Sequence, residues 1–119
     1  MTAQIAPQMQ RLLQLLGMAR RAGKIAQGFD AATAAMQMQT AAMVCIAGDC
    51  AERTVRNVRR VAKETDTAVM ELSCTREQLG QSIGCAPTGV LVITDHGFAK
   101  KARALIPENM ESIKEENVL

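Results

Sequence analysis

Aromatic residues are nearly absent from this sequence of 119 residues, which has no Trp, no Tyr and only two Phe. A folded core must therefore be built from Leu, Ile, Val, Ala and the eight Met, whose flexible side chains fill irregular gaps. Hydrophobic residues still make up 48% of the chain, which is enough for one sizeable core. We expect a single domain over residues 1–107, with the methionines as core fillers rather than as the lining of a ligand groove.

Groups suited to catalysis or metal binding are also few. The only histidine, His96, would have to serve any usual catalytic triad, and it follows Thr94-Asp95 at an expected helix start, where a surface position is the simpler explanation. The four cysteines form no C-x-x-C pair, which argues against a zinc site. The glycines form neither a dinucleotide-binding nor a P-loop pattern. We therefore expect no enzyme activity, no metal and no cofactor.

Segments that would direct the chain to or through a membrane are missing as well. The start of the sequence lacks a basic-then-apolar signal pattern, and no run approaches the roughly 18 apolar residues that cross a bilayer. We expect a cytoplasmic protein with reduced cysteines. Cys45 lies in an apolar run and should be buried, whereas Cys50 and Cys74 are expected to be reduced thiols in loops.

Charge is unevenly distributed along the chain, although the formal net charge is only +2. Up to Lys63, nine Lys and Arg stand against three Asp and Glu, whereas from Glu64 onward five basic residues face nine acidic ones. This asymmetry is compatible with a basic face for a polyanion and an acidic tail in solvent, expected over residues 108–119. Ordinary solvated helix faces would explain the charges equally well.

Hydrophobic periodicity and turn residues predict helices that alternate with strands. The helices are expected at residues 8–22, 30–38, 51–63, 75–83 and from about 96 to 105, and the strands at 24–27, 42–47, 67–72 and 90–94. The third helix is amphipathic and basic, with Arg53, Arg56, Arg60 and Lys63 on one face. This order favours an α/β protein in which helices cover both faces of a central sheet, and the short first and third strands leave a mixed sheet open.

Gly28, at the start of the second expected helix, is a first candidate for ligand binding. Backbone N–H groups at a helix N-terminus can bind an anion, and glycine lets a ligand approach closely. Three basic residues precede it, namely Arg20, Arg21 and Lys24. From these residues alone, a plain tight turn remains the simpler explanation.

Four segments of the chain resemble blocks of one protein family. Residues 12–24, LLQLLGMARRAGK, are similar to the LLGLARRAGK opening of the bacterial YlxQ-type branch of the kink-turn-binding ribosomal-protein superfamily. VCIAGD at 44–49, REQLG at 76–80 and ITDHGFAKK at 93–101 resemble later blocks, in the same order and at similar spacing. The resemblance implies a three-layer α/β/α sandwich with a four-stranded mixed sheet, no catalysis, and recognition of kinked RNA.

The resemblance also implies a binding motif, which this chain keeps only in part. RNA-binding members of the superfamily carry G-x-N-E-x-x-K at the turn into the second helix, where this chain has GFDAATA at residues 28–34. Gly28 matches, and Asp30 stands at the asparagine position, where it can accept hydrogen bonds but cannot donate them. Ala31 and Ala34 replace the glutamate and the lysine. Two of the three polar contacts are therefore lost.

A second part of the implied surface is the loop before the fourth helix, which packs against an extruded base in those members. Ser73, Cys74, Thr75 and Arg76 offer small contacts and a guanidinium there, although Arg76 equally suits an exposed helix start. Phe29 has the ring needed to stack on an unpaired base, but we prefer the interpretation that it packs back onto the core and staples the helix.

We therefore expect a non-enzymatic, ribosome-associated RNA-binding protein with a degenerate kink-turn motif. Its partner would be structured RNA, with the ribosome or other proteins as further partners, and neither a membrane nor DNA is expected. The alternative is a protein–protein interaction module on the same fold that has lost specific kink-turn binding. The expected RNA-binding residues are Arg20, Arg21, Lys24, Gly28, Phe29, Asp30, Ser73, Cys74, Thr75 and Arg76.

Overall fold

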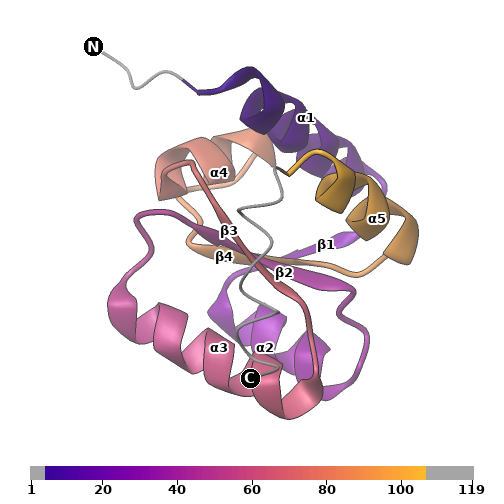
Figure 1. Cartoon of the computed structure of the whole chain (residues 1–119), viewed down its shortest axis with the longest axis vertical. Helices are drawn as coiled ribbons and strands as arrows, with labels where there is room; N and C mark the ends of the chain where they lie inside the picture. Colours follow the sequence, from indigo (N-terminus) through magenta and orange to yellow (C-terminus); the bar gives the residue numbers. More distant parts are fainter. Residues whose placement is uncertain (1–4, 107–119) are drawn as a thin grey trace.

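The structure, a computed structural model, describes residues 5–106 as a sheet between two layers of helices (Figure 1). The helices are α1 (Pro7–Arg21), α2 (Phe29–Gln37), α3 (Glu52–Thr65), α4 (Arg76–Ser82) and α5 (His96–Ala104). The strands are β1 (Ile25–Gln27), β2 (Met43–Ala47), β3 (Val69–Leu72) and β4 (Val90–Ile93). Each predicted element is present at nearly the predicted residues. The expected domain boundary at residue 107 and the acidic tail at 108–119 lie outside the described residues.

The sheet is mixed, as the family resemblance implied. Its strand order is β1-β4-β2-β3, with β2 and β3 parallel and with β4 antiparallel to both of its neighbours. The carboxyl ends of β1, β2 and β3 therefore meet at one end of the sheet, together with the amino end of β4. Four loops that are far apart in the sequence are brought together there.

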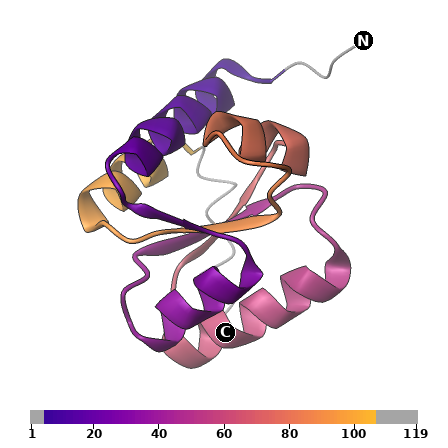
Figure 2. The ribbon, with the colours of Figure 1, turned by 180° about the vertical axis from the view of Figure 1, so that it is seen from behind.

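The two faces of the sheet build two separate cores, because side chains alternate along each strand. Figure 2 shows α1, α4 and α5 on one face and α2 and α3 on the other. The strand residues Val44, Ile46, Val90, Val92 and Ile93 are buried, each at most 2% exposed. Met9, Met36, Met43 and Met70 fill the cores, whereas Met18 and Met38 lie at the surface.

Helix starts and close helix contacts fix the loops at this end of the sheet. Thr75 and Gln78 form a capping box, in which the Gln78 N–H donates to Thr75 Oγ1 and the Thr75 N–H donates to Gln78 Oε1. At the opposite end of the sheet, Asp95 caps α5 by accepting from the Phe98 N–H at 2.9 Å. Gly80 lets the segment after α4 lie against the helix, because a Cβ there would come within 2.1 Å of the Ala86 carbonyl oxygen. Over residues 5–106, none of the helices has the length and apolar character needed to cross a membrane.

Candidate nucleic-acid interface

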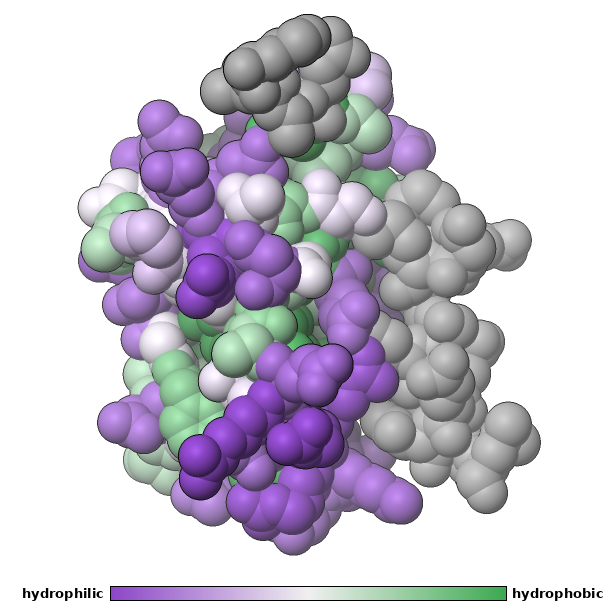
Figure 3. Space-filling model, turned by 90° about the vertical axis from the view of Figure 1, so that its left-hand side faces the viewer, coloured by the Kyte–Doolittle hydropathy of each residue, from purple (hydrophilic) through white to green (hydrophobic). Residues whose placement is uncertain are grey.

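The two segments predicted to bind RNA lie at the same end of the sheet. β1 leads into Gly28 and α2, and β3 leads into Ser73 and α4, and both strands end there. Figure 3 views this side of the molecule, where β2 passes into α3 and β3 into α4, and shows a mainly hydrophilic surface around a smaller hydrophobic area. Two segments about 45 residues apart in the sequence thus share one face.

Gly28 sets the direction in which the chain enters α2. Its φ of 102° and ψ of 162° belong to a region that is essentially restricted to glycine, and its N–H donates to the Val90 carbonyl oxygen at 2.9 Å. No side chain caps α2. Within residues 5–106, the N–H groups of Phe29, Asp30 and Ala31 have no hydrogen-bond acceptor. These donors are available to an anion.

The first turn of α2 has little polar chemistry of its own. Asp30 is exposed and places a carboxylate beside the free N–H groups, while Ala34 is exposed and Ala31 is half-buried. The hydroxyl of Thr33 donates back to the Phe29 and Asp30 carbonyl oxygens at 3.0 and 3.1 Å. Phe29 is 38% exposed, so the preferred interpretation of a ring packed into the core was wrong. Phe29 is the first residue of α2, which follows the edge strand β1, and there it lies partly at the surface.

The loop between β3 and α4 is much more tightly held. The Arg76 N–H donates to Asp49 Oδ1 at 2.7 Å, and the Arg76 Nε lies 3.7 Å from the same oxygen. Both side chains are about half exposed, so this ion pair contributes little stability by itself. Ser73 is exposed, whereas Cys74 is buried and its carbonyl oxygen accepts from the Gly48 N–H. The Cys74 thiol is therefore inside the protein, and the guanidinium of Arg76 is the charged group at the surface.

Thr88 joins the two segments, and sequence reasoning missed it. Its hydroxyl accepts from Gln27 Nε2 at 3.3 Å, and its N–H donates to the Arg76 carbonyl oxygen at 2.9 Å. Thr88 is 1% exposed and is the buried polar side chain of the described residues. At the adjacent Gly89, a Cβ would lie 3.6 Å from Arg76 Cδ and 3.0 Å from Cys50 Sγ. The segment before β4 thus links the end of β1 to the loop of Arg76.

The three basic residues before Gly28 do not lie together. Arg20 Nη1 donates to Cys85 Sγ at 3.1 Å, which places it beside the segment that leads to Thr88. Arg21 instead lines a hollow between α1 and α4. Lys24 is at the far end of β1, where its carbonyl oxygen accepts from the Thr94 N–H. At roughly 3.3 Å per residue, Lys24 is about 13 Å from Gly28 along the strand, so of the three only Arg20 lies beside the segment that leads to Thr88.

Burial raises the pKa of three cysteine thiols, those of Cys45, Cys50 and Cys74. Burial raises the pKa of Cys74 to about 11, with a further increase from the Asp49 carboxylate, and raises the pKa of Cys45 to about 12. Burial also raises the pKa of Cys50, although the Arg76 guanidinium opposes that shift. All four cysteines are free. Within residues 5–106, no group of three or more His, Cys, Asp or Glu side chains is placed to hold a metal ion.

The comparison with protein-family models decides the family. Residues 10–103 match the Ribosomal protein L7Ae/L30e/S12e/Gadd45 family. The chain belongs to this family. Within the L7Ae family, it is 35% identical over 97 residues to the RNA-binding protein YlxQ of Enterococcus faecium, covering 82% of this chain and 92% of that protein. It is 30% identical over 92 residues to the RNA-binding protein YlxQ of Bacillus subtilis, covering 77% and 91% respectively. The resemblance to YlxQ-type proteins is therefore confirmed.

Solved structures similar to this L7Ae-family chain have the same fold. A Bacillus halodurans protein of unknown function has a TM-score of 0.75 and 27% sequence identity, covering 80% of this chain and 95% of its own. The Giardia lamblia 15.5kD RNA binding protein has a TM-score of 0.66 at 19% identity, covering 87% and 93%. The second likeness shows the α/β fold alone.

Proposed function

We propose that this protein is a non-enzymatic RNA-binding protein that contacts structured RNA of the ribosome. The observation that carries the proposal is the meeting of an uncapped helix N-terminus and an exposed guanidinium at one end of the sheet. The N–H groups of Phe29, Asp30 and Ala31 and the side chain of Arg76 are all donors, and phosphate oxygens are their natural acceptors. The names of the two curated relatives, both RNA-binding proteins, support the RNA-binding part of this proposal.

Each part of the surface has a separate task in this proposal. The start of α2 accepts a phosphate, the guanidinium of Arg76 reaches a phosphate or a base edge, and Arg20 adds positive charge at the border. The exposed ring of Phe29 is available to stack on an unpaired base. The backbone of Ser73, Cys74 and Thr75 forms the wall of the site.

The surface is poorly equipped to distinguish a kinked RNA from a straight one. Ala31 and Ala34 have no side-chain hydrogen-bonding groups, and the Asp30 carboxylate repels phosphate at the same helix start. Arg76 also forms an ion pair with Asp49, which partly neutralises its positive charge. We therefore propose that binding is mainly electrostatic, with weak preference for kink-turns. The four free thiols fit the cytoplasmic location that we propose with this function.

Replacing Arg76 tests the proposal directly. Arg76→Gln removes one cation from the proposed surface, and Arg11→Gln removes one from the exposed face of α1. We expect the first substitution to weaken binding to a ribosomal RNA hairpin, and to purified ribosomes in co-sedimentation, much more than the second. Because Arg11 has the same charge and exposure, equal losses for the two variants would contradict the proposed surface. Absence of RNA binding by the wild-type protein at low salt would contradict the function itself.

A protein-interaction module on the same fold is a second candidate, and one observation favours it. α2 exposes Phe29, Ala34 and, at its C-terminal end, Met38, which is 72% exposed. Apolar surface at these positions suits a protein partner better than a phosphate. A wild-type protein that fails to bind RNA at low salt, yet binds ribosomes in a manner lost in Phe29→Ser, would support this alternative.

A further inference from the structure

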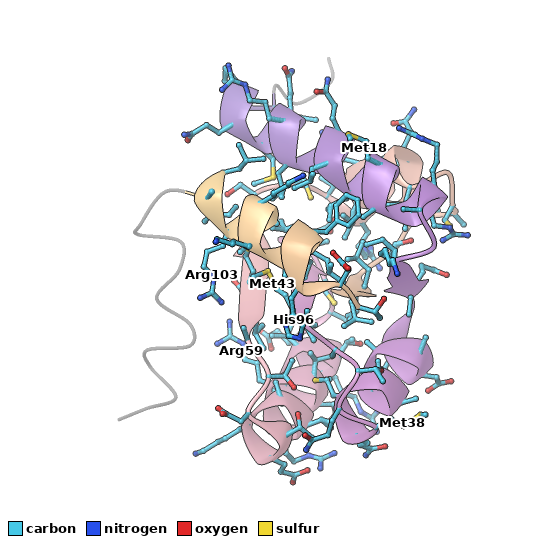
Figure 4. The ribbon with its side chains drawn as sticks, turned by 90° about the vertical axis from the view of Figure 1, so that its right-hand side faces the viewer. Met18, Met38, Met43, Arg59, His96 and Arg103 are labelled. Carbon is cyan, nitrogen blue, oxygen red and sulfur yellow. The ribbon has the colours of Figure 1, made fainter. Side chains whose placement is uncertain are left out.

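A small hollow lies beside α5. Its lining comes from Ala42 and Met43, at the start of β2, and from four residues of α5, namely His96, Ala99, Lys100 and Arg103. Figure 4 shows His96 and Arg103 along α5 with Met43 close to them. The volume is about 250 Å³, with an apolar floor and a rim of basic side chains.

This hollow is at the opposite end of the sheet from the candidate interface. The Ala42 N–H donates to the Ile93 carbonyl oxygen at 2.7 Å, so the hollow adjoins the amino end of β2 and the carboxyl end of β4. The five residues of β2 separate it from the loop of Asp49 by about 17 Å. Figures 3 and 4 view these two ends from opposite sides of the molecule.

The basic residues of the hollow form one stripe that no acidic residue in the described part of the chain neutralises. His96, Lys100 and Arg103 are spaced by four and three residues and so share a face of α5. α5 has no Asp or Glu, and over residues 5–106 neither Lys100 nor Arg103 forms an ion pair. The helix dipole accounts for a cation in the last turn, but not for Lys100 or His96.

The neighbouring charged groups are already engaged. Asp95 directs its carboxylate to the Phe98 N–H, and the ammonium group of Lys101 lies 5.9 Å from the centre of the Phe98 ring. Arg59, on the side of the molecule seen in Figure 4, is paired with Glu71. The basic face of α3 also differs from the α5 stripe. Its arginines have acidic partners, since Glu52 lies 3.9 Å from Arg56 and Glu64 lies 3.5 Å from Arg60. Among residues 5–106, the stripe on α5 thus has no acidic partner and can accept an anion.

The size of the hollow favours one phosphate group of a polymer over a whole small molecule. Pockets that enclose small molecules usually measure about 300–1,000 Å³, more than the 250 Å³ found here. We propose that the hollow binds a backbone phosphate of a second RNA segment, so that one protein molecule holds RNA at both ends of its sheet. This inference rests on the proposed function and extends it from binding one RNA segment to joining two.

The single histidine of the chain provides a site-specific test. His96 is the only histidine, so one imidazole Cε1–H signal in a carbon–proton NMR spectrum of the full-length protein reports on the hollow. We expect a short straight RNA duplex to shift this signal in the wild type and in Arg76→Gln. The shift should be lost in Lys100→Gln/Arg103→Gln. It should persist in Arg53→Gln/Lys63→Gln, which removes the same charge from exposed, unpaired positions on α3.

Joining of two RNA segments needs a second measurement. Two short duplexes, one with a donor and one with an acceptor fluorophore, should show energy transfer when the protein is added at half their total concentration. Energy transfer should be lost in Arg76→Gln and in Lys100→Gln/Arg103→Gln, and should persist in Arg53→Gln/Lys63→Gln. Sedimentation in parallel must show a monomeric protein, because energy transfer that requires a protein dimer would overturn the proposal.

Three other results would overturn the proposed second RNA site, and each can be distinguished from the expected result. RNA binding that depends on Arg76 without any shift of the His96 signal would overturn the second site and leave the proposed function standing. A shift of the same size with sodium phosphate at matched ionic strength would assign the hollow to free phosphate. A shift caused by Glu108→Gln/Glu111→Gln/Glu115→Gln/Glu116→Gln without RNA would assign it to the chain's own acidic segment. Either result would overturn the proposal.

Discussion

The start of α2 and the loop before α4 lie side by side, yet they are built in different ways. The loop is held by a capping box, by a hydrogen bond from the Arg76 N–H to Asp49, and by Thr88. The start of α2 has no side-chain cap, and its entry depends on the backbone conformation of Gly28. One region is fixed by side-chain chemistry and the other by glycine geometry.

The difference shows that this fold can keep the shape of a binding surface after part of its chemistry is gone. Gly28 still aims the first N–H groups of α2 outward, and Thr88 still ties that end of β1 to the loop of Arg76. The glutamate and lysine of the family motif are replaced by Ala31 and Ala34. In the function that we propose, general attraction for phosphate remains, while contacts that would select one RNA shape are missing.

Both regions depend on the same sheet, so breaking the sheet should remove them together. Ile93 is 0% exposed, and burying its side chain contributes about 1.5–3 kcal/mol, to which a buried carboxylate adds several more. Ile93→Asp should therefore unfold a domain of ordinary stability, as measured by circular dichroism and thermal melting. Ala51→Asp introduces the same group at the exposed N-cap of α3 and should remain folded. A folded, RNA-binding Ile93→Asp protein would contradict the placement of β4.

Restoring the lost side chains should sharpen the difference between kinked and straight RNA. Hydrogen bonds with charged groups contribute about 1.5–3 kcal/mol each, and with imperfect additivity Ala31→Glu/Ala34→Lys should improve kink-turn binding by about 3 kcal/mol, on the order of 100-fold. The exposed Ala34 and half-buried Ala31 leave room for both side chains.

The control for this prediction is Gln37→Glu/Thr40→Lys, which adds the same pair of charges, three residues apart, at exposed positions at and just beyond the C-terminal end of α2. It should leave the preference between the two RNAs unchanged. Equal binding gains for both double variants in fluorescence titrations would show that the restored residues act only through their charge.

Gly28→Ala tests the region that depends on backbone geometry. A methyl group at this position meets nothing within 4 Å, so the penalty comes from the backbone conformation alone and should be about 1–3 kcal/mol. Urea unfolding should show this loss, and RNA binding should weaken as the start of α2 moves. Thr33→Ala, one turn further along α2, removes only a local hydroxyl bond and should change stability by less. Unchanged stability in Gly28→Ala would rule out the left-handed turn.

Thr75→Ala tests the region fixed by side chains, and its effect should be the smallest. Loss of an N-cap side chain usually costs about 1 kcal/mol, and the loop of Arg76 would retain its bonds to Asp49 and Thr88. We expect lower stability in urea and only slightly weaker RNA binding. Ser82→Ala, at the other end of α4, should have a smaller effect on both. Loss of RNA binding in Thr75→Ala equal to that in Arg76→Gln would mean that the cap, rather than the other bonds, holds the loop.

Local sequence signals were sufficient for the helices and strands, but not for the way in which they assemble the candidate surface. The strand at β2 with its buried Cys45 and the helix that begins near Thr75 are properties of short segments, and both were predicted correctly. Thr88 was missed because its role depends on Gln27, which is 61 residues away and reaches it only through the strand order β1-β4-β2-β3. The same strand geometry separates Lys24 from Gly28, although the two are close in sequence.

The most direct test of the central claim is a fluorescence anisotropy titration of the unmodified protein with a kink-turn RNA and with a straight duplex at physiological salt. The account predicts dissociation constants for both RNAs within the range of about 10⁻⁴–10⁻⁶ M that is typical of non-specific nucleic-acid binding, with affinity that falls steeply as salt is raised. Nanomolar binding of the kink-turn alone, with little dependence on salt, would contradict it. Such a result would show that Gly28, Asp30 and the loop of Arg76 suffice for shape recognition.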